Sequence, residues 1–158
     1  MTNKTPPPPI LVPVDFSPHS EEALLFAADL AHRLDAPLII LHVVHDPGEA
    51  PGYYTQKNPE HPHRIADIAA DMMADFINRI AKETPGQSNI LQATTKLITG
   101  LPVTRILEVV EQCNPQMVIM GSKGRTGLTH LLLGSKAEQV VRLCPAPVTI
   151  IKKTDNKE

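Results

Sequence analysis

Aromatic residues are scarce in this chain. It has no tryptophan, and aromatic residues make up 3% of its 158 residues. Proteins that bind single-stranded nucleic acid stack bases on aromatic rings, so this composition argues against such a platform. The net charge is also small, −2 at pH 7. The chain as a whole therefore has no bulk attraction to nucleic acid or to anionic lipid.

Cysteine and long apolar runs are scarce too. The chain has two cysteines, Cys113 and Cys144, which are too few for a disulfide framework, and we expect both to be small buried apolar residues. The beginning of the sequence, MTNKTPPPP, lacks the basic-then-apolar pattern of a secretory signal. No apolar run approaches the length of a membrane span. The sequence therefore predicts a cytoplasmic protein with no membrane insertion.

The common phosphate-binding motifs are absent as well. There is no GxxxxGK[ST] loop, and Gly121, Gly124 and Gly127 follow G-x2-G-x2-G rather than the dinucleotide pattern GxGxxG. Neither a HIGH-type signature nor an SGGxD motif of nucleotidyl transfer occurs. A phosphoacceptor receiver domain needs an acidic cluster after its first strand, whereas Asp15 stands alone there.

What the chain does have is a regular alternation of apolar runs and helical patterns. Residues 37–44, PLIILHVV, form a continuous apolar run of the kind found in strands that are covered on both faces. The segments expected to be strands are 10–15, 37–44, 90–99, 117–120 and 147–152. The segments expected to be helices run from Pro18, after an N-capping Ser17, to about Asp35, from about 63 to 83, around 103–110, and from Ser135 onward.

This order predicts an α/β fold with parallel strands, right-handed crossovers and helices on both faces. Sheets of this kind bind ligands outside the carboxyl ends of their strands, where strand order reverses. The ends on offer are Asp15, Val43 and Met120–Gly121.

The length predicts a single domain. We expect a proline-rich flexible N-terminus at 1–9, the domain at 10–153 and a polar tail at 154–158. Residues 45–62 are rich in proline, glycine and polar side chains. Loops of that length are uncommon inside a compact domain, which favours a lid, a binding loop or a disordered insert.

A glycine-rich segment follows one of the strand ends. From 121 to 153 the chain carries six basic residues and one acid, a charge of +5, which leaves −7 for the remainder. The motif is Gly121-x2-Gly124-x9-Gly134-Ser135, in which Gly134 and Ser135 lie where a helix begins. Helix N-termini offer unpaired N–H groups and partial positive charge to phosphate, and Arg125 and Lys136 could add ionic contacts.

A structural explanation competes with this one. Ser135-x-x-Glu138 is a capping box, which would account for the serine without any ligand. Gly127 could be a turn residue, and short motifs match by chance often enough that the glycines alone do not decide the matter.

Three stretches, ILVPVDFS, LHVV and VIMGSKGRTGLTHLLLGSKAEQVV…CPAPVTIIK, resemble the universal stress protein family. The resemblance runs from 10 to 152, and the glycine spacing matches G-2x-G-9x-G-[S/T] of the ATP-binding branch of that family. It implies an open five-stranded parallel sheet of order 3-2-1-4-5, similar to that of adenine-nucleotide alpha-hydrolases. It also implies a homodimer formed partly through the last strand (Val148 to Lys152), and ATP or AMP, with or without Mg²⁺, at the strand ends.

The resemblance also assigns roles to the positions that match the family pattern. Asp15 would lie near the ribose. The adenine pocket would be lined by Pro13, Val14, Val43 and Met120, with Val43 contacting the base partly through its backbone. The ribose and the phosphate groups would be approached by Gly121 and Gly124, and the phosphate tail would be held by Gly134 with Ser135.

Histidine offers weaker candidates. His45, His61 and His63 could be imagined around a metal, but loop histidines without a cysteine or carboxylate partner are usually exposed, and we expect no metal site. His42 is expected to be a satisfied core histidine, and His130 a surface residue.

Three functions are compatible with the sequence. The first is a regulatory homodimer that binds ATP or AMP and changes a surface read by a partner protein in a stress response. The second is a slow ATPase or phosphotransferase, although phosphoryl transfer needs an oriented nucleophile and the sequence does not identify a residue that would act together with the candidates, Asp15 and His130; we expect at most weak hydrolysis and no assigned catalytic residue. The third is a nucleotide-free interaction module, which the intact glycine spacing disfavours.

Overall fold

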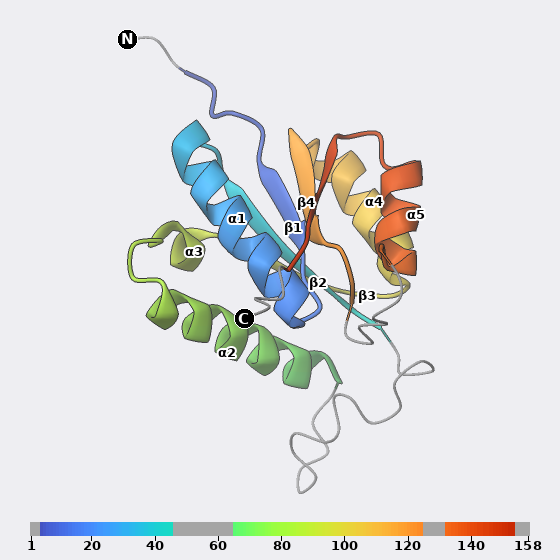
Figure 1. Ribbon diagram of the computed structural model, residues 1–158, viewed down its shortest axis with the longest axis horizontal. Helices are drawn as coiled ribbons and strands as arrows, with labels where there is room; N and C mark the ends of the chain where they lie inside the picture. The colour runs from blue at the N-terminus through green and yellow to red at the C-terminus, as the bar shows by residue number, and fades with distance from the viewer. Residues whose placement is uncertain (1–3, 46–64, 125–131, 154–158) are drawn as a thin grey trace, which may run out of the picture.

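The computed structural model describes residues 4–45, 65–124 and 132–153 (Figure 1). The strands are β1 (Ile10–Pro13), β2 (Leu38–Val44), β3 (Thr94–Thr99), β4 (Met117–Gly121) and β5 (Val148–Ile151). The helices are α1 (Pro18–Leu34), α2 (Ile65–Glu83), α3 (Asn89–Gln92), α4 (Pro102–Cys113) and α5 (Ser135–Leu143). None of the described helices is long and apolar enough to cross a membrane.

The five strands form one parallel sheet in the order β3-β2-β1-β4-β5. This confirms the predicted fold class, strand direction and strand order. The order reverses at β1, which pairs with β2 on one side and with β4 on the other. The carboxyl ends of these three strands are therefore the place where the topology opens a crevice.

Each face of the sheet has its own apolar core. One core joins α1 and α2 to alternate strand residues such as Ile10, Val12 and Ile40, and the other joins α4 and α5 to Leu11 and Leu41. Figure 1 shows these two pairs of helices on opposite faces. All seven residues of β2 are buried, which is the physical reason why its sequence is continuously apolar.

Local sequence sets the ends of α1. Ser17 is its N-cap, with extended backbone, and its side-chain oxygen accepts a hydrogen bond from the N–H of Ser20, while Pro18 occupies the first turn. The helix ends at Leu34, and its C-cap is Asp35, whose φ of 52° is left-handed. The predicted start and end of this helix are confirmed.

The segment predicted as a strand from 90 to 99 is partly wrong. Residues Asn89–Gln92 form the short helix α3, and the strand begins at Thr94. The cause is tertiary: Ile90 is 1% exposed in the core, and the amide nitrogen Nδ2 of Asn89 donates to the carbonyl of Ala28 at 2.7 Å. The hydrogen bond fastens α3 to α1, and a local apolar pattern could not reveal either the bond or the burial of Ile90.

Cys113 and Cys144 are half-buried rather than buried, which corrects a further expectation. They pack at the margin of the core beneath α4 and α5 because they lie at the last residue of α4 and at the C-cap of α5.

Candidate functional site

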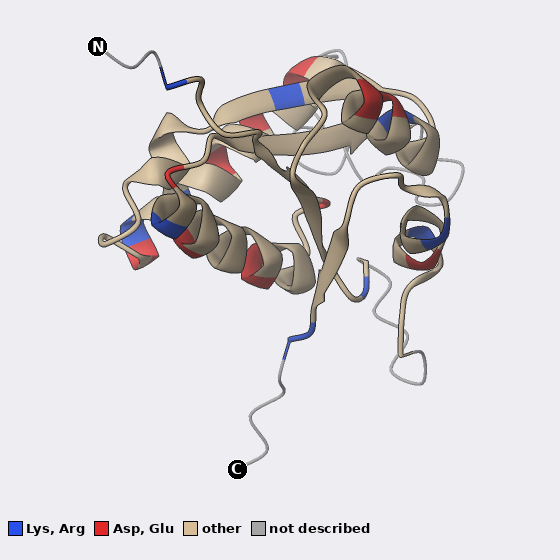
Figure 2. Cartoon of the chain, turned by 90° about the horizontal axis from the view of Figure 1, so that it is seen from above, with Lys and Arg blue, Asp and Glu red and all other residues tan. Residues whose placement is uncertain are grey.

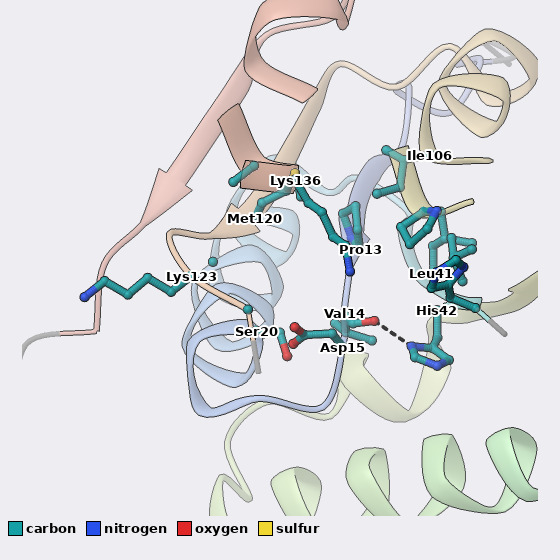
Figure 3. Close-up of a pocket in the computed structure, with 16 residues that line it drawn as sticks. Pro13, Val14, Asp15, Ser20, Leu41, His42, Ile106, Met120, Lys123 and Lys136 are labelled. Atoms are coloured by element: carbon teal, nitrogen blue, oxygen red, sulfur yellow. Dashed lines mark hydrogen bonds between the residues drawn. The ribbon is translucent and has the colours of Figure 1, made fainter. Parts of the chain in front are cut away.

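A cavity opens at the carboxyl ends of β1, β2 and β4, where the topology predicts a ligand site (Figure 3). Eight of the predicted site residues line it: Pro13, Val14, Asp15, Val43, Met120, Gly121, Gly124 and Lys136. Gly134 and Ser135 lie beside the cavity at the start of α5 without lining it. Arg125 is outside the described residues, as are His61, His63 and His130.

The turn between β1 and α1 fixes the direction of the Asp15 carboxylate. Its oxygen Oδ1 accepts the N–H of Ser17 at 3.0 Å. The residue between them, Phe16, has a φ of 66°, a conformation that a bulky side chain rarely adopts and that costs about 1–3 kcal/mol. Its ring packs on the rings of His42 and Phe76, with centroids 4.2 and 5.4 Å away. Buried packing therefore supports a strained turn at the mouth of the cavity.

His42 is a core histidine, as predicted, but it also lines the cavity. It is 2% exposed, and its Nδ1 lies 2.8 Å from the carbonyl oxygen of Val14. A carbonyl only accepts hydrogen bonds, so Nδ1 carries the proton. This bond ties the end of β1 to β2 just below the cavity (Figure 3).

Close packing constrains Gly121 and Gly124, both of which line the cavity. A Cβ on Gly121 would lie 2.7 Å from the main-chain carbon and oxygen of His19, so the absence of a side chain lets α1 pack closely against β4. This packing explains the glycine at position 121 without a ligand, and the predicted approach of a ligand to its backbone stays a prediction. A Cβ on Gly124 would lie 3.1 Å from Asp15 Oδ2, which places Gly124 directly beside the carboxylate.

The start of α5 also differs from the sequence interpretation. Its N-cap is Gly134, and Ser135 is the first helical residue. The capping box is therefore wrong as an explanation of Ser135, and Glu138 pairs instead with Arg142 at 2.9 Å. The N–H of Gly134 donates to the carbonyl of Ser122 at 2.6 Å. This bond closes the glycine segment back onto the end of β4, and Ser135 stays exposed.

The carboxyl ends of the strands lie in a region of positive electrostatic potential. Since each crossover helix runs opposite to the strands, α1, α4 and α5 all begin there, and a helix N-terminus carries about half a positive charge. Lys136 lines the cavity, and Figure 3 shows its side chain extending toward Asp15 and Val14. The side chain of Lys123 extends away from the other labelled residues in the same view.

The upper edge of β2 presents backbone groups to the cavity. Successive residues of a strand alternate between its two neighbours, as shown by Leu41, whose carbonyl accepts from Val14, and Val44, whose carbonyl accepts from Gly100. Val43 therefore faces the same side as Leu41. Because β1 ends at Pro13, the N–H and C=O of Val43 point over the end of β1 at the cavity wall.

Sequence reasoning missed one wall of the cavity. The additional lining residues are Ser20, Leu41, His42, His45, Pro102, Ile106, Lys123 and Ala137. Pro102 and Ile106 come from α4, whose helical pattern was evident but whose position over β2 was not. Within the described ranges, no group of three or more histidine, cysteine or acidic side chains could hold a metal ion.

The chain matches the model of the universal stress protein family over residues 8–152. It is 30% identical to universal stress protein YxiE of Bacillus subtilis, covering 90% of this chain and 97% of that protein. It is 28% identical to universal stress protein MJ0531 of Methanocaldococcus jannaschii, covering 91% and 81%. It spans about half the length of some mycobacterial relatives, such as Rv2005c of Mycobacterium tuberculosis, of which it covers 48% at 28% identity.

Solved structures agree with the fold. Universal stress protein UspA from Lactobacillus plantarum superposes with a TM-score of 0.72 at 24% identity, covering 93% of this chain and all but 1% of that one. A universal stress protein in complex with cAMP gives 0.61 at 20% identity, covering 95% of this chain and 100% of that one. The Archaeoglobus fulgidus protein in complex with dAMP gives 0.59 at 21% identity, covering 91% and 97%. The sequence match and the shared fold together show that this chain belongs to the universal stress protein family.

Proposed function

We propose that the protein binds an adenine nucleotide, ATP or AMP, in the cavity at the carboxyl edge of the sheet and acts as a nucleotide-sensing regulatory homodimer. One observation carries the proposal: a single cavity combines an apolar slot, a carboxylate and a cationic rim. The apolar slot would suit the base, the carboxylate the ribose, and the cationic rim the phosphate tail. The cAMP and dAMP complexes of proteins with this fold support the same class of ligand.

The apolar slot fits a purine. Its walls include Pro13, Val43, Ile106 and Met120, which can cover both faces of a planar ring. The N–H and C=O of Val43, at the open edge of β2, match an acceptor and a donor on the Watson–Crick edge of adenine. The slot would therefore supply apolar contact with the purine ring, and the hydrogen bonds of Val43 would fix the orientation of that ring.

The other end of the cavity fits the sugar and the phosphates. Asp15 can accept hydrogen bonds from ribose hydroxyl groups, and Gly124 lies close enough to the carboxylate that the ligand meets backbone there. The first turn of α5 and the ammonium of Lys136 supply positive potential for the phosphate tail. A Mg²⁺ ion accompanying ATP would be held mainly by phosphate oxygens and water, since Asp15 is the sole carboxylate among the described lining residues.

A sensor fits the described site better than an enzyme does. In-line phosphoryl transfer needs a group that orients the attacking water or hydroxyl. Asp15 Oδ1 already accepts the N–H of Ser17, which marks it as a positioning group. Slow hydrolysis in the same pocket is the alternative function, and a steady-state phosphate-release assay separates the two.

The first experiment is to extract the purified protein with acid and identify any adenine nucleotide that is released. Thermal unfolding with added MgATP or AMP should show a rise in melting temperature, because a ligand that binds only the folded state stabilises it. Absence of bound nucleotide together with no thermal shift would leave a nucleotide-free interaction module as the remaining function.

The dimer is proposed through β5. This strand is at the edge of the sheet (Figure 1), and all four of its residues are half-buried. Figure 2 shows basic residues, in blue, directly after the end of this strand, where the sequence has Lys152 and Lys153. An apolar edge strand is a template for pairing with a second copy.

The backbone of β5 allows a sharp test of this interface. The carbonyls of Pro147 and Ile151 accept bonds from β4, so the N–H of Ile150 faces outward. Ile150→Pro should convert the dimer to a monomer in light scattering, because it removes an outward donor without removing a β4 bond. Ile150→Ala loses the same side chain but keeps the N–H, and it should remain dimeric. A monomeric parent protein at high concentration would contradict the dimer.

A further inference from the structure

His45 lies one residue beyond β2, is half-buried and lines the cavity. Its Nδ1 is 3.3 Å from the carbonyl oxygen of Gly100, in the turn that leads into α4. Because that oxygen can only accept, Nδ1 carries a hydrogen, and in the neutral ring Nε2 is then a hydrogen-bond acceptor. The Gly100 contact thus determines both the ring orientation and the chemical character of the other nitrogen.

The position of His45 places it at the base end of the cavity. Side chains alternate along a strand, so His45 follows Leu41 and Val43 on the face covered by α4. Figure 3 shows Leu41 and Ile106 on one side of the cavity and Asp15 with Lys136 on the other. A nucleotide with its phosphates toward Lys136 therefore has its base beside Val43, Ile106 and His45.

We infer that His45 is a specificity-determining residue that selects purines with an amino group at position 6. This inference rests on the proposed binding of an adenine nucleotide. A 6-amino group has two hydrogens, one on the N1 side and one on the N7 side. The carbonyl of Val43 can accept the first, and Nε2 of His45 accepts the second.

A 6-oxo purine reverses this pattern. Its oxygen presents lone pairs to both acceptors, and its N1 carries a hydrogen that meets the N–H of Val43. Sites built to hydrogen-bond one substituent discriminate strongly against a ligand that leaves buried polar groups unpaired. Discrimination between 6-amino and 6-oxo purines would then depend on the His45 side chain as well as on the backbone of Val43.

The test measures dissociation constants by calorimetry for AMP, IMP and purine riboside 5′-monophosphate, which lacks any substituent at position 6. The protein is compared with His45→Leu, which removes the acceptor, and with His32→Leu. His32 is exposed near the end of α1, away from the cavity, and serves as the matched control. The critical quantity is the ratio of the dissociation constants of purine riboside monophosphate and AMP.

We expect the parent protein to bind AMP at least about tenfold more tightly than IMP. The dissociation constant of purine riboside monophosphate divided by that of AMP should fall about fivefold in His45→Leu, which is the effect of losing one neutral hydrogen bond. The same ratio should be unchanged in His32→Leu. His45→Phe should behave as His45→Leu does and replaces it if the leucine variant does not fold.

Equal ratios in the parent and in a folded His45 variant, with AMP still bound, would overturn the role of His45 and leave the nucleotide proposal intact. A parent protein that binds purine riboside monophosphate as tightly as AMP would do the same. Failure of the parent to bind AMP at millimolar concentration would refute both proposals.

Discussion

Substituting Gly134 tests the proposed phosphate end of the cavity. Gly134 has a φ of −67°, which any residue can adopt, so its backbone conformation does not demand glycine. A Cβ there would lie 3.4 Å from both the Cα of Lys123 and the carbonyl oxygen of Ser122. Alanine therefore fits with a shift of a few tenths of an ångström, whereas the two further methyl groups of valine overlap the main chain before Gly124.

Two magnitudes follow from this geometry. Overpacking of this kind costs about 1–3 kcal/mol, which should lower the melting temperature of Gly134→Val by several degrees without unfolding the protein. The same displacement would move Gly124 and the first turn of α5 away from the proposed position of the phosphate groups. Loss of a single charge-assisted hydrogen bond, about 1.5–3 kcal/mol, weakens ATP binding at least about tenfold.

The assay compares ATP with adenosine by calorimetry on the parent, Gly134→Ala and Gly134→Val. Adenosine has no phosphate, so its affinity should survive in both variants, and Gly134→Ala should bind ATP within about threefold of the parent. Gly86→Val is the control, because a Cβ at that position has nothing within 4 Å. Unchanged ATP affinity in folded Gly134→Val would refute the phosphate assignment, as would equal losses for ATP and adenosine.

Three further outcomes are expected. Gly121→Ala should lower the free energy of unfolding in urea by about 2–3 kcal/mol, since its Cβ would lie 2.7 Å from the main chain of α1, while Gly86→Ala should change it by less than about 1 kcal/mol; equal effects would contradict this packing role. Lys136→Ala should weaken ATP about fivefold and leave adenosine unchanged in calorimetry, and equal losses would show that Lys136 does not act on phosphate. Burial raises the pKa of the Cys113 thiol, opposed by the positive charge of Lys96; the native thiol should therefore alkylate more slowly at pH 8 than in urea, and Lys96→Ala should slow it further, as followed by peptide mass spectrometry. A faster reaction in Lys96→Ala would contradict that order.

The sequence alone determined the fold class, the strand directions and the edge of the sheet where a site should lie. These follow from local patterns in the sequence. The segment of β2 is continuously apolar because both of its faces are covered, and Ser17-Pro18 is a typical helix start. The glycine spacing marked the segment after β4, and eight of the predicted site residues line one cavity.

Only the tertiary structure decided which further residues line the cavity. His45 and Ile106 are 61 positions apart in the chain and line the same cavity because the crossover from β3 carries α4 back over β2. It also showed that Gly121 accommodates α1 and that Ile90 belongs to a helical turn fastened to α1. Periodicity states which side of an element is apolar, but it does not state which distant element covers that side, because that choice depends on packing between segments far apart in sequence.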